Sequence, residues 1–418
     1  MRRVQAWGAL CAAVSTAGGC VCAPAVASAS QPLPTPPAPR LSVTAAALID
    51  ERTGRQLYAL NGTEELSIAS TTKLMTALLT LEHVKRLSTT FAQIDYHPAA
   101  VDSQIGLLPS ERMSVHDLLL ALLLPSADDA AEDLAYNVGG RSVSRFVAMM
   151  NTGARQLGLR HTHYSTPIGL DTPGNHSSAR DLVELARFLL THHPFFAHAV
   201  DLHTAVLSTG DSVRRIVSTN RLVGRVPWIN GVKTGHTAAA GYVLVGSGTR
   251  NGVALVSAVL GASSEAGRDA NTLALLGWGF ANFRQVRPIL AGQVLARVPV
   301  RGQSNVRVPV IAARGVTEVI PKLSHAQVRV ELPRQLTAPR ARYAVIGTAV
   351  VVAGASTLAR VPLLLGRSVA APATSGTMLL TRPFTLVPLV LLLAAAAGFM
   401  VRRRARTKRS SAARAEPA

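Results

Sequence analysis

The segment from Ile68 to Leu79 constrains this chain most, because it places one hydroxyl and one amine in an almost wholly apolar helical pattern. Ser70 and Lys73 are three residues apart, so on a helix that begins near Ser70 their side chains share a face. The apolar residues that follow indicate that this helix is buried. Burial disfavours the ammonium form of a lysine, and a neutral lysine beside a serine can make the hydroxyl a nucleophile.

The choice of lysine strengthens this interpretation, since a Ser-x-x-Lys spacing alone also occurs by chance in buried helices. Of the 43 basic residues, only five are lysine, namely Lys73, Lys85, Lys233, Lys322 and Lys408. Arginine keeps its proton in a protein, whereas lysine can release it. A chain that otherwise uses arginine therefore has lysine at the one place where a base would be needed.

The net charge of +20 does not indicate a nucleic-acid partner. Six basic residues crowd the segment from Arg402 to Arg409, and no basic patch interleaved with aromatic residues occurs elsewhere. With 418 residues and 48% hydrophobic content, the chain can bury a large core and is expected to have more than one domain.

The amino-terminal residues 1–29 are typical of a secretory signal peptide, with Arg2 and Arg3 ahead of an apolar stretch that ends in small residues. All three cysteines lie in this segment, so a processed chain would contain no disulfide. An alternative is lipidation at Cys20, although the large aliphatic residue usual three positions before such a cysteine is missing. Residues 30–41 are rich in proline and predict an extended linker.

Near the other end, residues 384–401 form a stretch of 18 residues without a charge. As a helix it would span about 27 Å, enough for a bilayer core. Arginines flank it on both sides, which favours a single-pass anchor over a buried core helix. We therefore expect a cell-membrane protein whose folded part lies outside the cytoplasm and whose basic tail, 402–418, lies inside.

Between these ends, the pattern predicts an α+β domain over 42–283. Two strands, 43–49 and 55–60, come first, and helical periodicity follows to about residue 200, with Ser178 as the N-cap of a helix from Ala179. Three strands within 231–260 and a helix over 271–283 complete one antiparallel sheet flanked by helices. Residues 284–369 alternate apolar with polar and predict a small all-β domain, joined by a linker, 370–383, to the apolar stretch.

Three clusters then stand in order along the predicted catalytic domain: Ser70-Thr71-Thr72-Lys73, Ser126-Ala127-Asp128 and Lys233-Thr234-Gly235. This set resembles the SxxK, SxN and KTG motifs of the low-molecular-weight D-alanyl-D-alanine carboxypeptidases, which are penicillin-binding serine peptidases. Further segments are similar to that family, and the likeness covers roughly residues 42–401. They are 45–50 with Thr53-Gly54, then 169–171, 175–176, 179–181 and 241–242.

The resemblance implies a β-lactamase/transpeptidase-like fold, and it implies a role for each motif residue. Ser70 would attack the peptide carbonyl, Lys73 would take its proton, and Ser126 would pass a proton to the leaving amine. Lys233 would lower the pKa of Lys73 by repulsion and hold the Ser126 hydroxyl, and Thr234 would bind the substrate carboxylate with it. The KTG motif continues through Gly235 to His236, whose backbone N–H, with that of Ser70, would form the oxyanion hole.

The substrate implied is the pentapeptide of peptidoglycan, with β-lactam antibiotics as ligands and without any cofactor or metal. Asp128 departs from the family, which has asparagine there. An ionised aspartate cannot donate the amide hydrogen bond to substrate, and its charge would keep Lys73 protonated.

The same residues bear on several alternatives. A class A β-lactamase is disfavoured because no glutamate occurs between Ser142 and Asp181 to drive deacylation. A transpeptidase is disfavoured by the single catalytic domain, and a metal site by the adjacency of His192 and His193. A catalytically weakened homologue that binds the cell wall remains open because of Asp128.

Overall fold

The computed structural model describes residues 37–94, 96–97, 102–371, 391–400 and 402. It divides into two compact units, each described here by itself. The first comprises the chain up to Pro288 with 317–327 and 351–358, and the second comprises 289–316, 328–350 and the chain from 359 onward. The domain boundaries expected from the sequence remain a prediction.

A five-stranded antiparallel sheet with the strand order β2-β1-β9-β8-β7 forms the centre of the first unit. Its strands come from both ends of the unit, as expected: β1 (Ala45–Asp50), β2 (Gln56–Leu60), β7 (Ile229–Thr237), β8 (Gly241–Arg250) and β9 (Val253–Ala262). Strand β1 is buried along its whole length. Its alternate side chains enter two different hydrophobic cores, which explains its continuous apolar sequence.

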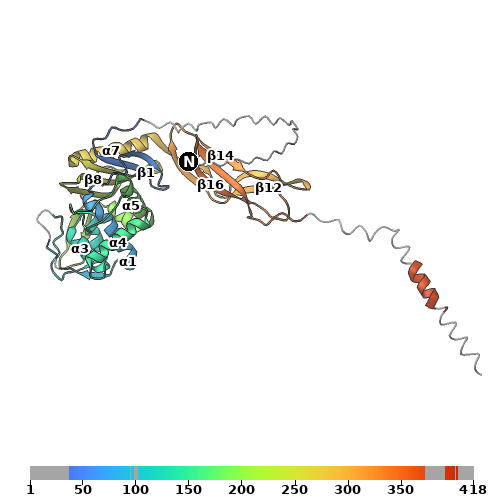
Figure 1. Ribbon diagram of the computed structural model, residues 1–418, viewed down its shortest axis with the longest axis horizontal. Coiled ribbons are helices and arrows are strands. Elements are labelled where there is room, and N and C mark those ends of the chain that lie inside the picture. The colour runs from blue at the N-terminus through green and yellow to red at the C-terminus, as the bar shows by residue number, and fades with distance from the viewer. Residues whose placement is uncertain (1–36, 95, 98–101, 372–390, 401, 403–418) are drawn as a thin grey trace, which may run out of the picture. The chain divides into compact units, whose positions relative to one another are not determined.

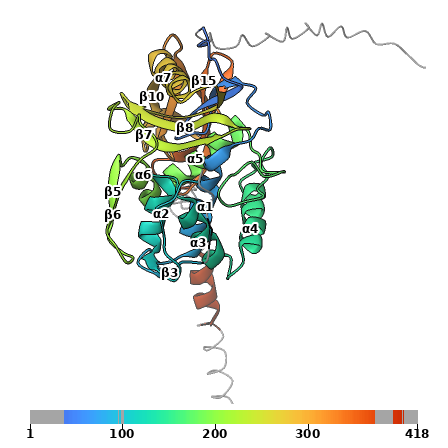
Figure 2. The same ribbon diagram turned by 90° about the vertical axis from the view of Figure 1, so that its left-hand side faces the viewer.

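Helix α7 (Glu265–Asn282) covers one face of this sheet, and the other helices lie on the opposite face (Figures 1 and 2). They are α1 (Lys73–His83), α2 (Val115–Leu123), α3 (Asp128–Val138), α4 (Val143–Gln156), α5 (Ala179–His192) and α6 (Pro194–Val200). Short strands complete the unit: β3 (Thr90–Ala92) with β4 (Arg112–Ser114), and β5 (Thr204–Leu207) with β6 (Arg214–Val217).

Serine side chains begin several of these helices. The Ser178 side chain accepts a hydrogen bond from the N–H of Asp181, which confirms the predicted N-cap of α5. Ser264 does the same for Gly267, so α7 begins six residues earlier than the apolar periodicity predicted. The periodicity shows where a helix packs, whereas the cap decides where it begins.

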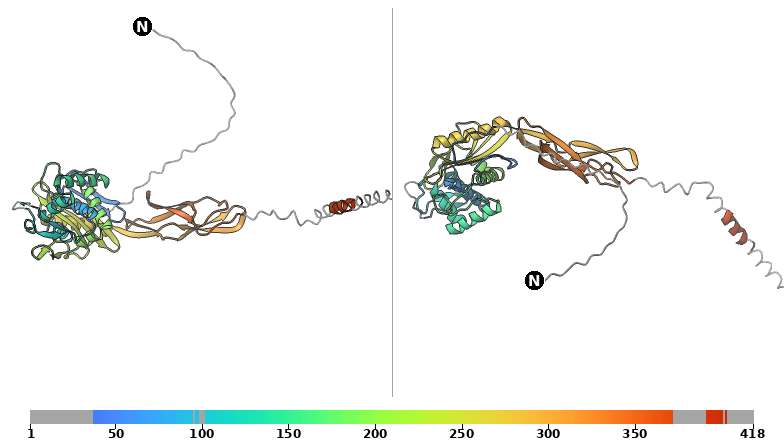
Figure 3. Two further views of the ribbon diagram at one scale, coloured as in Figure 1. Left: turned by 90° about the horizontal axis from the view of Figure 1, so that it is seen from below. Right: turned by 45° about the horizontal axis from the view of Figure 1, so that its top comes forward.

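The second unit is built on a five-stranded sheet with the order β11-β12-β16-β15-β14 (Figure 3). Strands β10 (Phe283–Ile289) and β13 (Val316–Pro321), which belong to the first unit except for Ile289 and Val316, form a separate pair. The five strands are β11 (Val294–Val300), β12 (Gln303–Ala312), β14 (Ala326–Glu331), β15 (Val345–Ala353) and β16 (Ser356–Leu365).

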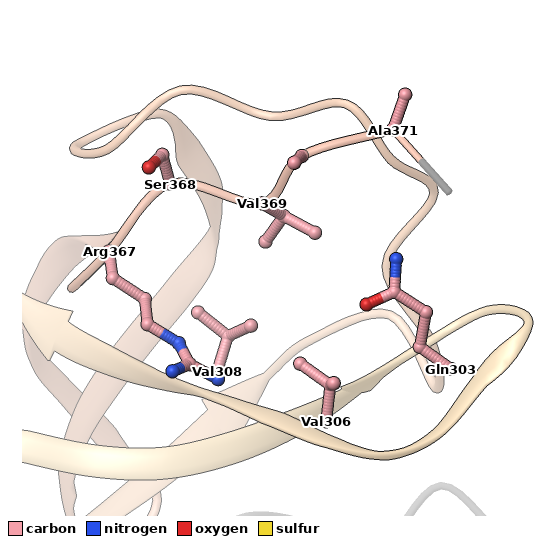
Figure 4. A pocket seen from close by; sticks show the side chains of 8 residues that line it. Gln303, Val306, Val308, Arg367, Ser368, Val369 and Ala371 are labelled. Atoms are coloured by element: carbon pink, nitrogen blue, oxygen red, sulfur yellow. The ribbon is translucent and has the colours of Figure 1, made fainter. Parts of the chain in front are cut away.

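Alternate side chains of β12 and β16 are buried, in agreement with the predicted β pattern. Val308, Val310, Leu363 and Leu365 are all fully covered. At the end of the sheet where β12 begins and β16 ends, the residues that follow β16 border a hollow of about 520 Å³, lined by valines, Gln303 and Arg367 (Figure 4).

Among the described residues, no helix combines the length and the apolar character that crossing a bilayer requires. The predicted span, 384–401, lies partly outside those residues, and 391–400 within it are helical. The C-terminal transmembrane helix therefore remains a prediction, as do the signal peptide, 1–29, and the linkers, 30–41 and 370–383. Residues 1–36 and 372–383 of these segments lie outside the described residues.

Candidate active site

Ser70 lies in a single 3₁₀ turn, Ala69–Thr72, and Lys73 is the first residue of α1. The predicted helix therefore begins three residues later than Ser70, but the turn keeps the two side chains on the same side. Ala69 has a φ of +48°, a left-handed conformation that is uncommon for alanine. This sharp entry into the helix presents the Ser70 hydroxyl beside the Lys73 amine.

Two glycines allow other segments to approach this turn. At Gly169, with a φ of +93°, a Cβ atom would lie 2.1 Å from the backbone oxygen of Ala69. At Gly235, on β7, a Cβ atom would lie 2.9 Å from the Ala69 side chain and 3.1 Å from the Ser70 nitrogen. Any larger residue at either position would push its segment away from Ser70.

The Lys73 amine makes three short contacts in a fully buried position. Its Nζ lies 2.9 Å from the Ser70 hydroxyl, 2.9 Å from the carbonyl oxygen of Ile168 and 2.6 Å from Oδ1 of Asp128. An ammonium would use all three protons in these contacts. A neutral amine would donate to Ile168 and Asp128 and accept the Ser70 proton on its lone pair, so the same geometry also suits a general base.

The protonation of Lys73 reflects opposing effects. Burial lowers the pKa of Lys73 and outweighs the attraction of Asp128, which favours the ammonium. Burial also raises the pKa of Asp128, against the opposing effect of Lys73. The predicted influence of Asp128 on Lys73 therefore has a direct structural basis in this ion pair.

Ser126 follows α2 in the turn that leads to α3, as the sequence predicted. Its φ is +68°, and its buried hydroxyl has no hydrogen-bond partner among the described residues. The expected contact between Lys233 and this hydroxyl is therefore not formed in this structure. Instead, the Lys233 amine donates to the carbonyl oxygen of Thr234, 3.2 Å away. Because buried hydroxyls normally have a partner, Ser126 is free to bond to a substrate.

Strand β7 carries Lys233, Thr234, Gly235 and His236 along the edge of the sheet beside the 3₁₀ turn. Burial first, and then repulsion from Lys73, lower the pKa of Lys233 well below its ordinary value. In the structure, burial lowers the Lys73 pKa, as the apolar helix predicted, and the repulsion between the two lysines lowers the pKa of Lys233. The exposed His236 ring stacks on Tyr242, with 4.0 Å between centroids.

Sequence reasoning missed Thr219, which follows β6. Its hydroxyl lies 2.6 Å from the Thr234 hydroxyl and 3.2 Å from the carbonyl oxygen of Leu124. Thr219 thus links β7 to the end of α2, just before Ser126. No sequence pattern marks this threonine, because its contacts join segments 15 and 95 residues away.

Other missed contacts fix the loop between α4 and α5. The Asn175 side-chain amide donates to the Thr72 hydroxyl at 3.1 Å, and the Thr237 hydroxyl donates to Asp171 at 2.6 Å. The resemblance had marked 169–171 and 175–176 without giving them a role. The structure shows that they attach this loop to the 3₁₀ turn and to the end of β7.

The described residues contain no group of three or more histidine, cysteine or acidic side chains arranged to hold a metal ion. His192 and His236 each stack on a neighbouring aromatic ring. The Ser70, Lys73, Ser126 and β7 arrangement can carry out acyl transfer with these side chains themselves, by a serine nucleophile and a lysine base.

Comparisons with known proteins agree with this arrangement. Residues 30–264 match the family model described as D-alanyl-D-alanine carboxypeptidase, and residues 283–371 match the C-terminal domain of penicillin-binding protein 5. The chain is 34% identical over 329 residues to D-alanyl-D-alanine carboxypeptidase DacC of Escherichia coli, covering 74% of this chain and 80% of that protein. It is 29% identical over 325 residues to DacF of Bacillus subtilis, covering 76% and 83%.

Among solved structures, penicillin-binding protein 5 of Haemophilus influenzae is similar with a TM-score of 0.67 and 30% identity. The alignment covers 80% of this chain and 99% of that one. The predicted mixed α/β transpeptidase-like fold with a second, β-rich domain is thereby confirmed. On this evidence, the chain belongs to the D-alanyl-D-alanine carboxypeptidase family of serine peptidases.

Proposed function

We propose that this protein is a serine-type D-Ala-D-Ala carboxypeptidase that removes the terminal D-alanine from peptidoglycan stem peptides. The observation that carries the proposal is the contact of the fully buried Lys73 amine with the partly buried Ser70 hydroxyl at 2.9 Å. Ser70 Oγ attacks the carbonyl of the penultimate D-alanine while its proton passes to Lys73. The C–N bond then breaks, Ser126 passes a proton to the departing amine, and water hydrolyses the ester on Ser70.

Positive charge and hydroxyl groups on β7 support the carboxypeptidase assignment. Lys233 and Thr234 lie where the free carboxylate of a terminal D-alanine would be bound, and Thr219 supports the Thr234 hydroxyl. The N–H groups of Ser70 and His236 would stabilise the oxyanion, each by about 3 kcal/mol. β-Lactams, which carry a comparable carboxylate, would acylate the same serine.

The presence of Asp128 does not favour the alternative function, that of a homologue that binds the cell wall without turnover. Its carboxylate accepts a hydrogen bond from Lys73 whether the lysine is neutral or charged. Asp128 therefore disfavours the neutral form of Lys73 but does not prevent Lys73 from accepting the proton of Ser70.

Two assays on the purified protein test this function. A fluorescent penicillin should label Ser70, and a diacetylated Lys-D-Ala-D-Ala peptide should release D-alanine. Ser70→Ala should abolish both signals, whereas Ser212→Ala, which changes an exposed serine, should leave them unchanged. An adduct on another serine, or turnover by the Ser70→Ala variant, would reject the assignment.

We further propose that the protein is anchored in the cell membrane, with its folded units on the outer side. The uncharged stretch 384–401 between Arg382 and the basic tail supports this location. Removal of residues 384–418 should release a soluble protein that still reacts with penicillin. If the truncated protein stays on membranes, mass spectrometry of the amino terminus would show whether Cys20 carries a lipid.

A further inference from the structure

The second unit has an unusual charge composition. Its described part up to residue 371 contains ten arginines and one glutamate, Glu331, with no aspartate, lysine or histidine. All ten arginines are exposed. They are Arg297, Arg301, Arg307, Arg314, Arg329, Arg334, Arg340, Arg342, Arg360 and Arg367. Such a surface repels itself unless an anionic partner compensates it.

The segment from Arg340 to Val345 combines this charge with exposed apolar groups. Tyr343 is 53% exposed and Val345 66% exposed. The Arg342 guanidinium lies 4.6 Å from the centre of the Tyr343 ring. Tyrosine beside arginine suits the boundary between phospholipid headgroups and acyl chains, where the ring is half in water and the guanidinium meets phosphate.

This segment lies where the chain leaves the unit. The backbone of Arg340 pairs with that of Val369, two residues before Ala371, the last described residue of the unit's β-rich part. The N–H of Tyr343 donates to the carbonyl oxygen of Leu365 at the end of β16. Only 12 residues separate Ala371 from Phe384, where the uncharged stretch begins. Fully extended, they reach about 40 Å at most.

The hollow shown in Figure 4 lies beside the same segment, since Val369, whose backbone pairs with that of Arg340, lines it. Its wall contains Val306, Val308 and Val369, and the Arg367 side chain lies at its edge. Apolar walls next to a guanidinium provide contacts for a phospholipid rather than for a purely polar polyanion.

We propose that the segment 340–345, with Arg367 and the adjacent hollow, docks the second unit onto an anionic phospholipid surface. The inference goes beyond the proposed carboxypeptidase activity, and it uses the proposed membrane anchor only as the tether that keeps this segment near the bilayer. The anchor supplies attachment, and the docking segment fixes which end of the unit faces the lipid.

A single-cysteine reporter can test this in the full chain, because the native cysteines are confined to Cys11, Cys20 and Cys22. With these replaced by serine, Ala341→Cys carries a fluorescent dye, and the protein is incorporated into vesicles that contain nitroxide-labelled phospholipid. We expect strong quenching in phosphatidylglycerol vesicles, weak quenching in phosphatidylcholine vesicles, and loss of quenching in 0.5 M salt. A reporter at the exposed Ala313, which follows β12 at the other end of the same sheet, should be quenched in neither.

The paired variants Arg340→Gln with Arg342→Gln should lower the equilibrium constant for docking by roughly 25-fold, at about five-fold for each arginine near an anionic surface. The matched control is Arg314→Gln with Arg360→Gln, which removes the same charge elsewhere. Arg360 lies five residues before Leu365, about 17 Å away along a strand. The control should change docking by less than about three-fold.

Penicillin labelling of every variant verifies folding. Equal quenching in both lipids, no quenching in either, or an equal loss in the two paired variants would each overturn the proposal. If a soluble polyphosphate chain lowers the dye fluorescence and the nitroxide-labelled lipid does not, the arginines bind a wall polymer instead. Sedimentation with phosphatidylcholine vesicles in high salt reports the anchor alone, so failure of the anchor and failure of docking are distinguishable.

Discussion

The two units use charge in opposite ways. Between residues 42 and 288 the chain has 21 basic and 20 acidic side chains, and Lys73, Glu111 and Arg268, which are buried, each pair with a side chain of opposite charge. The second unit has ten exposed arginines up to residue 371, against one glutamate. Paired, buried charge holds reactive groups in place and adjusts their pKa values. Exposed charge of one sign does neither, and its physical consequence is attraction to an anionic partner.

The largest expected effect concerns the paired lysine of the site. Lys73→Arg keeps the positive charge next to Asp128 but removes the base, because a guanidinium does not release its proton. We expect acylation by penicillin to fall by about 10³-fold. Stopped-flow labelling measures this rate. A fall of less than about ten-fold would mean that charge, rather than proton transfer, is what this position supplies.

A second buried pair of the first unit tests whether paired charge stabilises the fold. Glu111 is buried, and both its oxygens accept hydrogen bonds from Arg214, at 2.7 and 2.9 Å. Burial acts to raise the pKa of Glu111, but Arg214 and the N–H groups of Leu108 and Asp211 outweigh it, so the pKa lies below its usual value. Glu111→Gln should reduce the free energy of unfolding at pH 7 by about 3 kcal/mol.

The pH dependence of that loss has a definite sign. A carboxyl with a lowered folded-state pKa stabilises the fold above its unfolded pKa, and this stabilisation is lost as the pH falls through the folded value. Urea unfolding of the Glu111→Gln variant and the parent should therefore converge as the pH decreases below about 4.5. Curves that stay equally separated at pH 3 would show that packing, not ionisation, explains the loss.

Asp128→Asn tests the residue where this chain departs from its family. An asparagine can donate to the substrate carbonyl, and removal of the negative charge lowers the pKa of Lys73 further, since Asp128 now favours the ammonium. Acylation should rise by roughly ten-fold, equivalent to about 1.4 kcal/mol. The acid limb of the pH–rate profile should move to lower pH, because the lysine loses its proton earlier. An unchanged rate and profile would indicate that Asp128 is protonated during the reaction.

The smallest effect is expected in the second unit. Arg314→Gln with Arg360→Gln removes two exposed charges, and the Arg360 guanidinium lies 3.9 Å from Glu331, also exposed. Such surface changes alter the free energy of unfolding by no more than about 0.5 kcal/mol. Penicillin acylation should also be unchanged. If the midpoint of thermal unfolding instead shifts by more than about 5 °C, these arginines contribute to the stability of the fold. The charges of the two units would then differ less in their physical role.

The sequence by itself was sufficient for the local elements and for the reactive residues. Helix α5 begins at its predicted cap, and β12 and β16 of the second unit bury alternate side chains as predicted, because caps and periodicity depend on neighbours within a few residues. Ser70 and Lys73 could be paired from their spacing alone. The fold class and the family followed from three short motifs in order.

Tertiary structure decided what the spacing could not. The contacts of Lys73 with Ile168 and of Thr234 with Thr219 join residues 95 and 15 positions apart, and the Asp128 carboxylate reaches Lys73 from another helix. No periodicity relates such residues, since their approach depends on how helices and sheet pack together. The sequence predicted that burial would make Lys73 a base, but the same packing determines which groups surround the amine and how far its pKa is lowered.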